Sequence, residues 1–458
     1  GLVGSEMCIR DRGGVSSPQL FKLFLEDLVK YLDTSCGVKI NGEMIAHLLL
    51  ADDLALISET KGGLQRLLDG FSQFCKRWHL VVNMDKTKYS IYNKKHSLPS
   101  NLKHLTYNGM PVKEVSEYTY VGLIFSTEKQ RFNKHIENVA TNANKAIFAA
   151  MSLAHKAMGS YPTAKTHLHI FETQIRPILE YAMPVWYNTN GYSLLEKLHT
   201  TYLKRALGVG KHTPHLALYG ETNTYPLHIR QQYFFLKYWL RLAIMPKGSI
   251  LHNIYKEHIN NNTDFISKIK TTLQSAGLPL IGEIPEIQAT DTTTILKLIK
   301  YNLENIFKTT WLHSINDSEK HPMLRTYKLF KTEFKREPYI DQIDDRQIQK
   351  SISKFRLSSH CLRIHTGRFE NIEAKDRICK ACNIHEIDNE EHFLLNCTFH
   401  KDRRNTLLSD IRNHIPLHMH NTQIFSNILN SDNPKIIHSL GNFLYTGFKK
   451  RRSLIFNQ

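Results

Sequence analysis

Four soft metal ligands lie close together in CKACNIHEIDNEEHFLLNC, residues 379–397. Cys379 and Cys382 have two residues between them, His392 follows after nine further residues, and Cys397 follows after four more. Three of the seven cysteines of the chain fall in this stretch. Thiolate and imidazole groups at such spacing are typical of a tetrahedral Zn²⁺ site, and four protein ligands leave no open position. The pattern therefore predicts a structural zinc knuckle.

The ligand set has alternatives. His385 and His400 are two further imidazoles that could replace His392. Unligated thiols of an intracellular protein are the competing interpretation of the cysteines.

Two adjacent carboxylates form a second group with metal-binding chemistry. LLLADDLALIS, residues 48–58, places Asp52 and Asp53 between two apolar runs of strand length, which predicts a β-hairpin with the acids at its turn. Neighbouring carboxylates repel each other, so the site favours a hard divalent cation. A surface turn with two solvated acids is the alternative.

The elements around this hairpin are helices and short strands. Residues 13–32 and 64–78 carry apolar residues at helical spacing. The runs LVVN (80–83) and KYSIY (88–92) are predicted strands, and YTYVGLIF (118–125) is another β-rich run. The order helix, hairpin, helix and strands predicts an antiparallel α+β arrangement rather than a parallel doubly wound sheet.

The remainder is predicted to be mainly helical. A first stretch covers about 130–245, with Gly208 and Gly210 closing one helix, and a second covers about 296–370. Between them, residues 246–295 are richer in Asn, Thr, Pro and Gly and suggest a boundary.

Composition favours a polyanionic partner. The 458-residue chain has 60 Lys and Arg against 42 Asp and Glu, a net charge of +18, and 41% hydrophobic residues. Such a surplus makes nucleic acid a better partner than a membrane surface. No apolar run approaches transmembrane length, and there is no secretory signal. We therefore expect an intracellular protein of the nucleus and cytoplasm.

The first twelve residues, GLVGSEMCIRDR, lack any element pattern. They are interpreted as the in-frame translation of a sequencing adapter joined to a partial transcript, and residues 1–12 are excluded from fold reasoning. A natural basic N-terminal arm is the alternative.

Four segments in order resemble the reverse transcriptases of non-LTR (LINE-type) retrotransposons. The segments GGVSSPQLFKLFLEDL, HLLLADDLALIS, GLQRLLDGFSQFCKRWHLVVNMDKTK and YTYVGLIFS are similar to motifs B, C, D and E of that family. THLHIFETQIRPILEYAMPVWY and LLEKLHTTYLKRALGV resemble its thumb-side region. The similarity covers most of residues 13–245, and four motifs in order are far more specific than any one of them.

The resemblance assigns roles to the acidic pair. Asp52 and Asp53 match the family's two hairpin aspartates, which help to hold two divalent cations, Mg²⁺ or Mn²⁺, for nucleotide transfer. Asp52 is the expected direct ligand. The family usually has an aromatic residue where this chain has Leu50, which changes packing near the primer end and leaves the carboxylates intact.

Other positions also match the family. Gly13 and Gly14 resemble the glycine loop of motif B that approaches nucleotide and template, although the Gln that commonly precedes it is here Arg12. Lys86 matches the motif D lysine near the triphosphate, with a solvated strand edge as the alternative for Lys86 and Lys88. The family's primer grip is matched by Tyr120, Val121 and Gly122, of which Tyr120 and Val121 could equally be core residues.

The third catalytic carboxylate of this family comes from motif A, which precedes the glycine loop. Only adapter-like residues precede Gly13 here, and Glu26 and Asp27 are expected to be solvated charges. The chain as printed is therefore expected to be catalytically incomplete.

The C-terminal region also resembles these elements. Cys379, Cys382, His392 and Cys397 match their Cys-Cys-His-Cys knuckle, which implies nucleic-acid binding. Some relatives carry a nuclease after the knuckle, but beyond Cys397 only three carboxylates remain, Asp402, Asp410 and Asp432. The basic run 449–452 (KKRR) instead suggests a binding tail, a nuclear signal or a solvated end.

These observations predict an α+β protein with an artefact at 1–12, a partial palm at 13–128, a helical thumb at 129–245, a linker and helical connector at 246–370, and a zinc knuckle with a basic tail at 371–458. The parent protein would carry out target-primed reverse transcription on an RNA template and a DNA target or primer. The alternatives are a non-catalytic nucleic-acid-binding relic and, less favoured, a group II intron maturase.

Overall fold

The computed structural model describes residues 23, 25–51, 53–92, 104–128, 131–159, 161–187, 191–279, 292–317, 319–416 and 418–456. Two compact units are distinguished. The first contains the described residues up to His135 together with Tyr238–Thr271. The second contains Ile136–Lys237 and the described residues from Thr272 onward.

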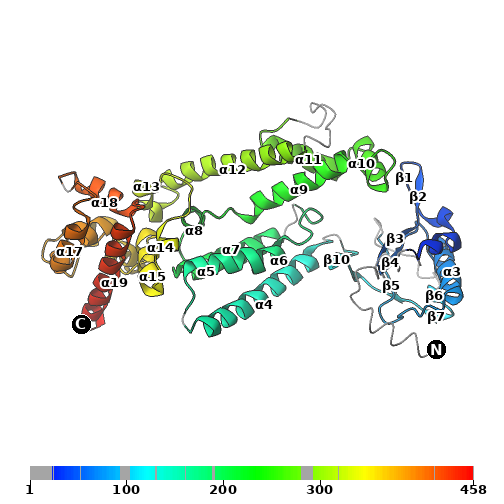
Figure 1. Ribbon diagram of the computed structural model, residues 1–458, viewed down its shortest axis with the longest axis horizontal. Helices are drawn as coiled ribbons and strands as arrows, with labels where there is room; N and C mark the ends of the chain where they lie inside the picture. The colour runs from blue at the N-terminus through cyan, green and yellow to red at the C-terminus, as the bar shows by residue number, and fades with distance from the viewer. Residues whose placement is uncertain are drawn as a thin grey trace. The chain divides into compact units, whose positions relative to one another are not determined.

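Short antiparallel hairpins form the strands of the first unit (Figure 1). They pair β1 (Val38–Ile40) with β2 (Glu43–Ile45), β3 (His47–Leu50) with β4 (Asp53–Leu56), β6 (Thr106–Tyr107) with β7 (Met110–Pro111), and β9 (Glu117–Tyr120) with β10 (Leu123–Ser126). The described strands also include one parallel pair, β5 (Lys88–Tyr89) with β8 (Lys113–Glu114). This confirms the hairpin predicted within residues 48–58, whose strands cover 47–50 and 53–56, and the α+β class with antiparallel strands.

Two further hairpins were detectable from their turns. Asn41-Gly42 and Asn108-Gly109 have positive φ at both residues, 48° and 88° in the first turn and 50° and 80° in the second. Asn-Gly is the preferred pair for such two-residue turns, because their twist matches that of the flanking strands. The hairpins at 38–45 and 106–111 are thus additions to the elements predicted above.

Helix α3 (Lys61–Arg77) organises the core of the first unit. Leu67 and Phe74 pack with Leu28, whereas Leu68 packs with Tyr107 in a second cluster. The short helix η1 (Glu26–Tyr31) approaches α3 closely at Gly70, where a Cβ would lie 2.2 Å from the carbonyl oxygen of Tyr31. A glycine is therefore required at that crossing.

Two predicted elements differ from the structure. The LVVN segment, 80–83, is irregular rather than a strand, and Val81 is 97% exposed. Residues 246–295, expected to be a boundary, contain the helices α10 (Ile250–Asn260) and α11 (Asp264–Ser275). Amphipathic helices therefore occupy a segment whose composition suggested a linker.

The other elements are helical, as predicted. They are η2 (Thr34–Cys36), α4 (Asn133–Met158), α5 (Ala164–Ile170), the π-helical turn η3 (Phe171–Ile175), α6 (Arg176–Glu180), α7 (Tyr192–Leu207), α8 (His215–Thr222), α9 (Leu227–Ala243), α12 (Thr292–Asn316), η6 (Pro322–Leu324), α13 (Tyr327–Phe330), α14 (Tyr339–Gln342), α15 (Arg346–Arg356), α16 (Arg363–Thr366), η7 (Gly367–Glu370), η8 (Ala374–Asp376), the π-helical turn η9 (His392–Asn396), η10 (Thr398–His400), α17 (Lys401–Ile411), α18 (Asn421–Leu429) and α19 (Pro434–Phe456). Gly208 ends α7 with a φ of 69°, which confirms the expected cap. Among the described helices, none combines the length and the apolar character needed to span a membrane.

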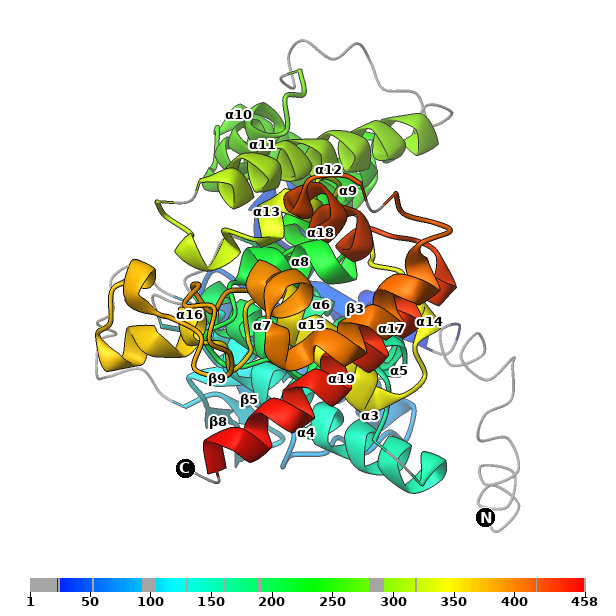
Figure 2. The same ribbon diagram turned by 90° about the vertical axis from the view of Figure 1, so that its left-hand side faces the viewer.

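The C-terminal helices of the second unit share one hydrophobic core. Phe355 of α15, Phe425 of α18 and Phe448 of α19 belong to the same buried cluster. Helix α19 packs along both α15 and α17, and Figure 2 shows α17 and α19 side by side. The C-terminal region beyond α15 is therefore a packed part of the unit rather than a loose tail.

A buried ion-pair network also holds the second unit together. Arg356 forms two hydrogen bonds of 2.9 Å to the carboxylate of Glu221 and an ion pair of 2.6 Å with Glu337. Lys331 also pairs with Glu337, and each of the four side chains is at most 3% exposed. Two cations and two carboxylates are thus balanced away from water, which buried charges require.

Candidate functional site

The four residues of the predicted knuckle form a single cluster. One ligand atom from each of Cys379, Cys382, His392 and Cys397 lies within 4.8 Å of all the others. Cys379, His392 and Cys397 are buried, and Cys382 is partly exposed. A tetrahedral zinc with Zn–S bonds of about 2.3 Å holds its ligand atoms about 3.8 Å apart. The donor set and its dimensions therefore fit zinc.

A small β-bridge and a π-helical turn position these ligands. Ile378 pairs with Ile387, and the Cys379 amide donates to the carbonyl of Glu386 at 2.9 Å. This closes the tight loop that carries both cysteines of the CxxC pair. His392 begins η9, and the Cys397 amide donates to the His392 carbonyl at 2.7 Å. The two halves of the cluster are thus fixed by main-chain hydrogen bonds.

Glu386 orients the imidazole of His392. Its Oε2 lies 2.8 Å from His392 Nδ1, so that Nε2 points toward the thiols and lies 3.4 Å from Cys382 Sγ. Burial favours the neutral imidazole, but hydrogen bonds to Cys379 and Glu386 outweigh it and raise the pKa of His392 to about 9. Metal binding would therefore release a proton from this ring. A carboxylate behind a ligating histidine is a common arrangement in metal sites.

The structure separates His392 from its two alternatives. His385 is exposed, with a φ of 60°, and lies outside the cluster. His400 is buried against the Phe393 ring at 4.7 Å, and burial lowers the pKa of its imidazole to about 4. His400 is therefore a neutral packing residue.

Of the two adjacent aspartates Asp52 and Asp53, the structure describes only Asp53. Asp52 lies outside the described residues, whereas Asp53 is exposed at the start of β4, where it pairs in register with Leu50. Ala51 in the turn has a φ of 53°, which is unusual for alanine. Burial raises the pKa of the Tyr120 hydroxyl, and the negative charge of Asp53 raises it further. The Asp53 hairpin and the β9–β10 hairpin thus lie within electrostatic range of each other.

The other residues predicted for the polymerase site lie in turns or outside the described residues. Val121 and Gly122 form the β9–β10 turn with φ of 48° and 74°. Lys86 is exposed and lies in a turn rather than a strand. Its backbone amide donates to the Asn83 side chain at 3.1 Å. Gly13 and Gly14 lie outside the described residues.

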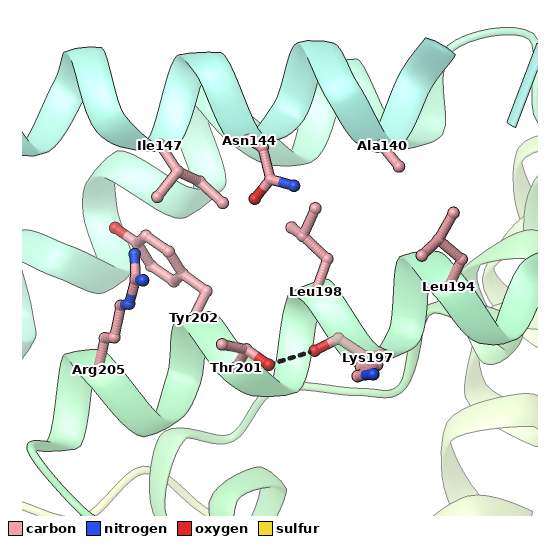
Figure 3. A pocket seen from close by; sticks show the side chains of 9 residues that line it. All are labelled: Ala140, Asn144, Ile147, Leu194, Lys197, Leu198, Thr201, Tyr202 and Arg205. Atoms are coloured by element: carbon pink, nitrogen blue, oxygen red, sulfur yellow. Dashed lines mark hydrogen bonds between the residues drawn. The ribbon is translucent and has the colours of Figure 1, made fainter. Parts of the chain in front are cut away.

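A basic groove lies between α4 and α7 (Figure 3). Its volume of about 240 Å³ is smaller than the volume of pockets that enclose small molecules. We therefore treat it as a shallow groove in the surface rather than a small-molecule pocket. Lys197, Thr201 and Arg205 are exposed one turn apart on α7, and Asn144 faces them from α4. The Arg205 guanidinium lies over the Phe148 ring at 5.5 Å, and this ring is 61% exposed. The groove therefore combines cations with an exposed aromatic face.

Several residues that lie beside the metal cluster could not be recognised from the sequence. Glu386 and Asp388 resemble any acids of a loop, and Arg451 sits in a run that suggested a solvated basic end. The structure differs at this point, because Arg451 is 4% exposed and pairs with Asp388. Lys449 and Arg452 are exposed, as expected.

Comparison with known proteins adds independent information. Residues 8–146 match the family described as reverse transcriptase (RNA-dependent DNA polymerase). A transposon-derived protein of Caenorhabditis elegans is 25% identical over 183 residues, which is 38% of this chain and 60% of that protein. A retrovirus-related Pol polyprotein from the type-2 retrotransposable element R2DM of Drosophila melanogaster is 37% identical over 75 residues, 16% of this chain and 7% of the polyprotein. The chain thus spans less than two thirds of either relative.

Proposed function

We propose that this chain serves RNA-directed DNA synthesis primed from nicked target DNA, because residues 8–146 match the reverse transcriptase family and 75 residues are similar to the Pol polyprotein of a type-2 retrotransposable element. The family match around the Asp52-Asp53 hairpin is the observation that carries the proposal. The substrates are an RNA template, a DNA primer end and nucleoside triphosphates.

The chain's own residues have separate tasks in this proposal. Asp52 and Asp53 hold divalent cations, which activate the primer 3′-hydroxyl and stabilise the leaving pyrophosphate. Lys86 approaches the triphosphate, and Gly13 and Gly14 approach the nucleotide and template. The hairpin turn at Val121-Gly122, with Tyr120 beside it, supports the primer end. The electrostatic influence of Asp53 on Tyr120 supports this placement.

We assign the organisation of the chain accordingly. Residues 13–128 are a partial palm, 129–245 a helical thumb, 246–370 a connector, and 371–458 a zinc knuckle with its packed C-terminal helices. The Cys379–Cys397 cluster binds one structural zinc and contributes to nucleic-acid binding. The fit of its four donor atoms to zinc supports this assignment.

Residues 13–458 contain Asp52 and Asp53 but no segment that matches motif A. In this family, motif A supplies the third catalytic carboxylate. The 458-residue polypeptide is therefore expected to show no primer extension with Mg²⁺ or Mn²⁺ in a primed-template assay. Extension that persists in the Asp52→Ala chain would refute the role of this pair. Extension that Asp52→Ala abolishes would show that another carboxylate of the chain completes the site.

A non-catalytic nucleic-acid-binding relic is the second candidate, favoured by the basic groove. Both candidates require binding, so we expect the chain to bind RNA and DNA mainly through phosphate contacts. Replacing Lys197 and Arg205 together by Ala should make the slope of log affinity against log salt shallower by about 1.4 on single strands and about 1.8 on duplex. Fluorescence anisotropy with labelled oligonucleotides over a salt series measures this slope.

The matched control replaces Lys297 and Lys435, two exposed lysines outside the groove, by Ala. It removes the same charge and should leave the slope unchanged. Equal slopes for the two double variants would exclude the groove from the binding surface, and no binding at low salt would refute both candidate functions for this chain.

A further inference from the structure

The basic run at 449–452 is not uniform in the folded chain. Lys449 and Arg452 are exposed, and Lys450 lies over the Phe399 ring at 4.4 Å. Arg451 instead turns inward and is 4% exposed. A buried guanidinium needs a partner, because desolvating an unpaired charge is costly.

Arg451 reaches the Cys379 side of the metal cluster. It forms an ion pair with Asp388, and its Nη2 lies 4.0 Å from Cys379 Sγ. Asp388 is itself fully buried, and its Oδ2 accepts from the Arg363 amide at 2.7 Å. The guanidinium is thus held in place between a fixed carboxylate and a ligand sulfur.

A second buried arginine contacts another ligand residue, Cys397. Arg404 of α17 is 8% exposed and donates to the carbonyl oxygen of Cys397 at 2.9 Å. Helices α17 and α19, which pack against each other, therefore each place one guanidinium beside a ligand cysteine.

Close packing brings α19 to this position. A Cβ at Gly447 would lie 3.0 Å from the Phe393 ring, the residue that follows His392. The next residue, Phe448, stacks on Phe393 with ring centroids 4.7 Å apart. A larger side chain at 447 would push α19 away from the π-helical turn and remove Arg451 from Asp388.

The buried charges of this region balance only when both arginines are counted; the Glu386 carboxylate is left out of this count because 45% of its side chain is exposed to solvent. Three thiolates and a neutral imidazole around a divalent cation carry one net negative charge. The buried carboxylate of Asp388 adds a second. Arg451 and Arg404 supply two positive charges in direct contact with these groups or with the backbone of a ligand.

We propose that Arg451 and Arg404 are the countercharges of the Cys379–Cys382–His392–Cys397 site, and that metal binding is thereby coupled to the docking of α17 and α19. By linkage, whatever free energy the docked helices add to metal binding, the bound metal adds to helix docking. The proposal rests on the zinc site proposed above. It makes the two arginines positioning residues that are not metal ligands.

The first test compares zinc affinity in full-length chains by competition with a chromophoric chelator. Arg451→Gln and Arg404→Gln should each weaken zinc binding by about 10- to 100-fold, as outer-shell changes usually do. Arg452→Gln and Arg412→Gln, exposed arginines of the same two helical regions, should leave it unchanged. Arg451→Lys keeps the charge and should recover most of the affinity, which a purely steric role would not predict.

If the zinc affinity of the Arg451→Gln chain is within about threefold of that of the Arg452→Gln chain, the countercharge role is overturned, because outer-shell changes usually cost at least about tenfold. A wild-type chain that binds no zinc would instead overturn the premise of the metal site. The two failures are therefore distinguishable in one titration.

The second test needs no substitution. Hydrogen exchange of the wild-type chain, with and without zinc, should show that chelation exposes the amides of α17 and the last turns of α19 together with residues 376–400. Exposure confined to 376–400 would overturn the coupling, and the amides of α7 provide an internal reference that should not change.

Discussion

Replacing Cys379 by Ser is expected to abolish stoichiometric zinc binding and to unfold residues 376–400. A structural zinc contributes about 10 kcal/mol or more of apparent binding free energy in small zinc domains, and that energy is lost with the site. Metal analysis of the purified chain should give one zinc for the wild type and none for the variant. Limited proteolysis should then cut within 376–400 while the helices of the thumb-like region stay intact.

Cys361→Ser is the matched control, since Cys361 is a free cysteine of the same region outside the cluster. It should retain one zinc and the wild-type proteolysis pattern. A Cys379→Ser chain that still holds a full equivalent of zinc would exclude this sulfur as a ligand, and less than half an equivalent in the wild type would reject the site itself.

Replacing Arg356 by Met is expected to destabilise the second unit by about 3–5 kcal/mol, the usual cost of breaking a buried ion pair from one side. The substitution leaves Glu221 and Glu337 buried with only Lys331 as a cation. It also removes the guanidinium from the Phe330 ring, 4.6 Å away. Urea titration, monitored by hydrogen exchange at the amides of α15, measures the loss of unfolding free energy.

A surface pair provides the comparison. Arg336 and Asp341 are 2.8 Å apart with 33% and 43% of their side chains exposed, so Arg336→Met should cost at most about 1 kcal/mol. Equal losses in Arg336→Met and Arg356→Met would contradict the role assigned to the buried network.

The parts of the structure that local spacing determines could be predicted. The CxxC pair, His392 and Cys397 were identified because a tetrahedral site restricts ligand type and spacing within one short segment. The β3–β4 hairpin was identified because two apolar runs flank a polar turn. In both cases the residues that act together are also neighbours in the sequence.

Features that depend on distant partners could not be predicted. LVVN has strand-forming residues, but a strand also needs a neighbour to pair with, and Val81 is exposed instead. Arg451 lies 63 residues from Asp388, and neither residue differs in type from ordinary surface charges. Only the packing of α19 onto the π-helical turn, through Gly447, distinguishes Arg451 from Arg452.

The distance between the ligands and Arg451 also has a consequence for synthesis. A ribosome completes all four ligands at Cys397, before it adds α17 and long before it adds Arg451. If the arginines complete the site, a nascent chain holds its metal loosely until α19 has been made and has docked. A nonsense codon between 398 and 450 would then yield a product with an intact ligand motif and poor metal retention, which cellular proteases would recognise by its open C-terminal region.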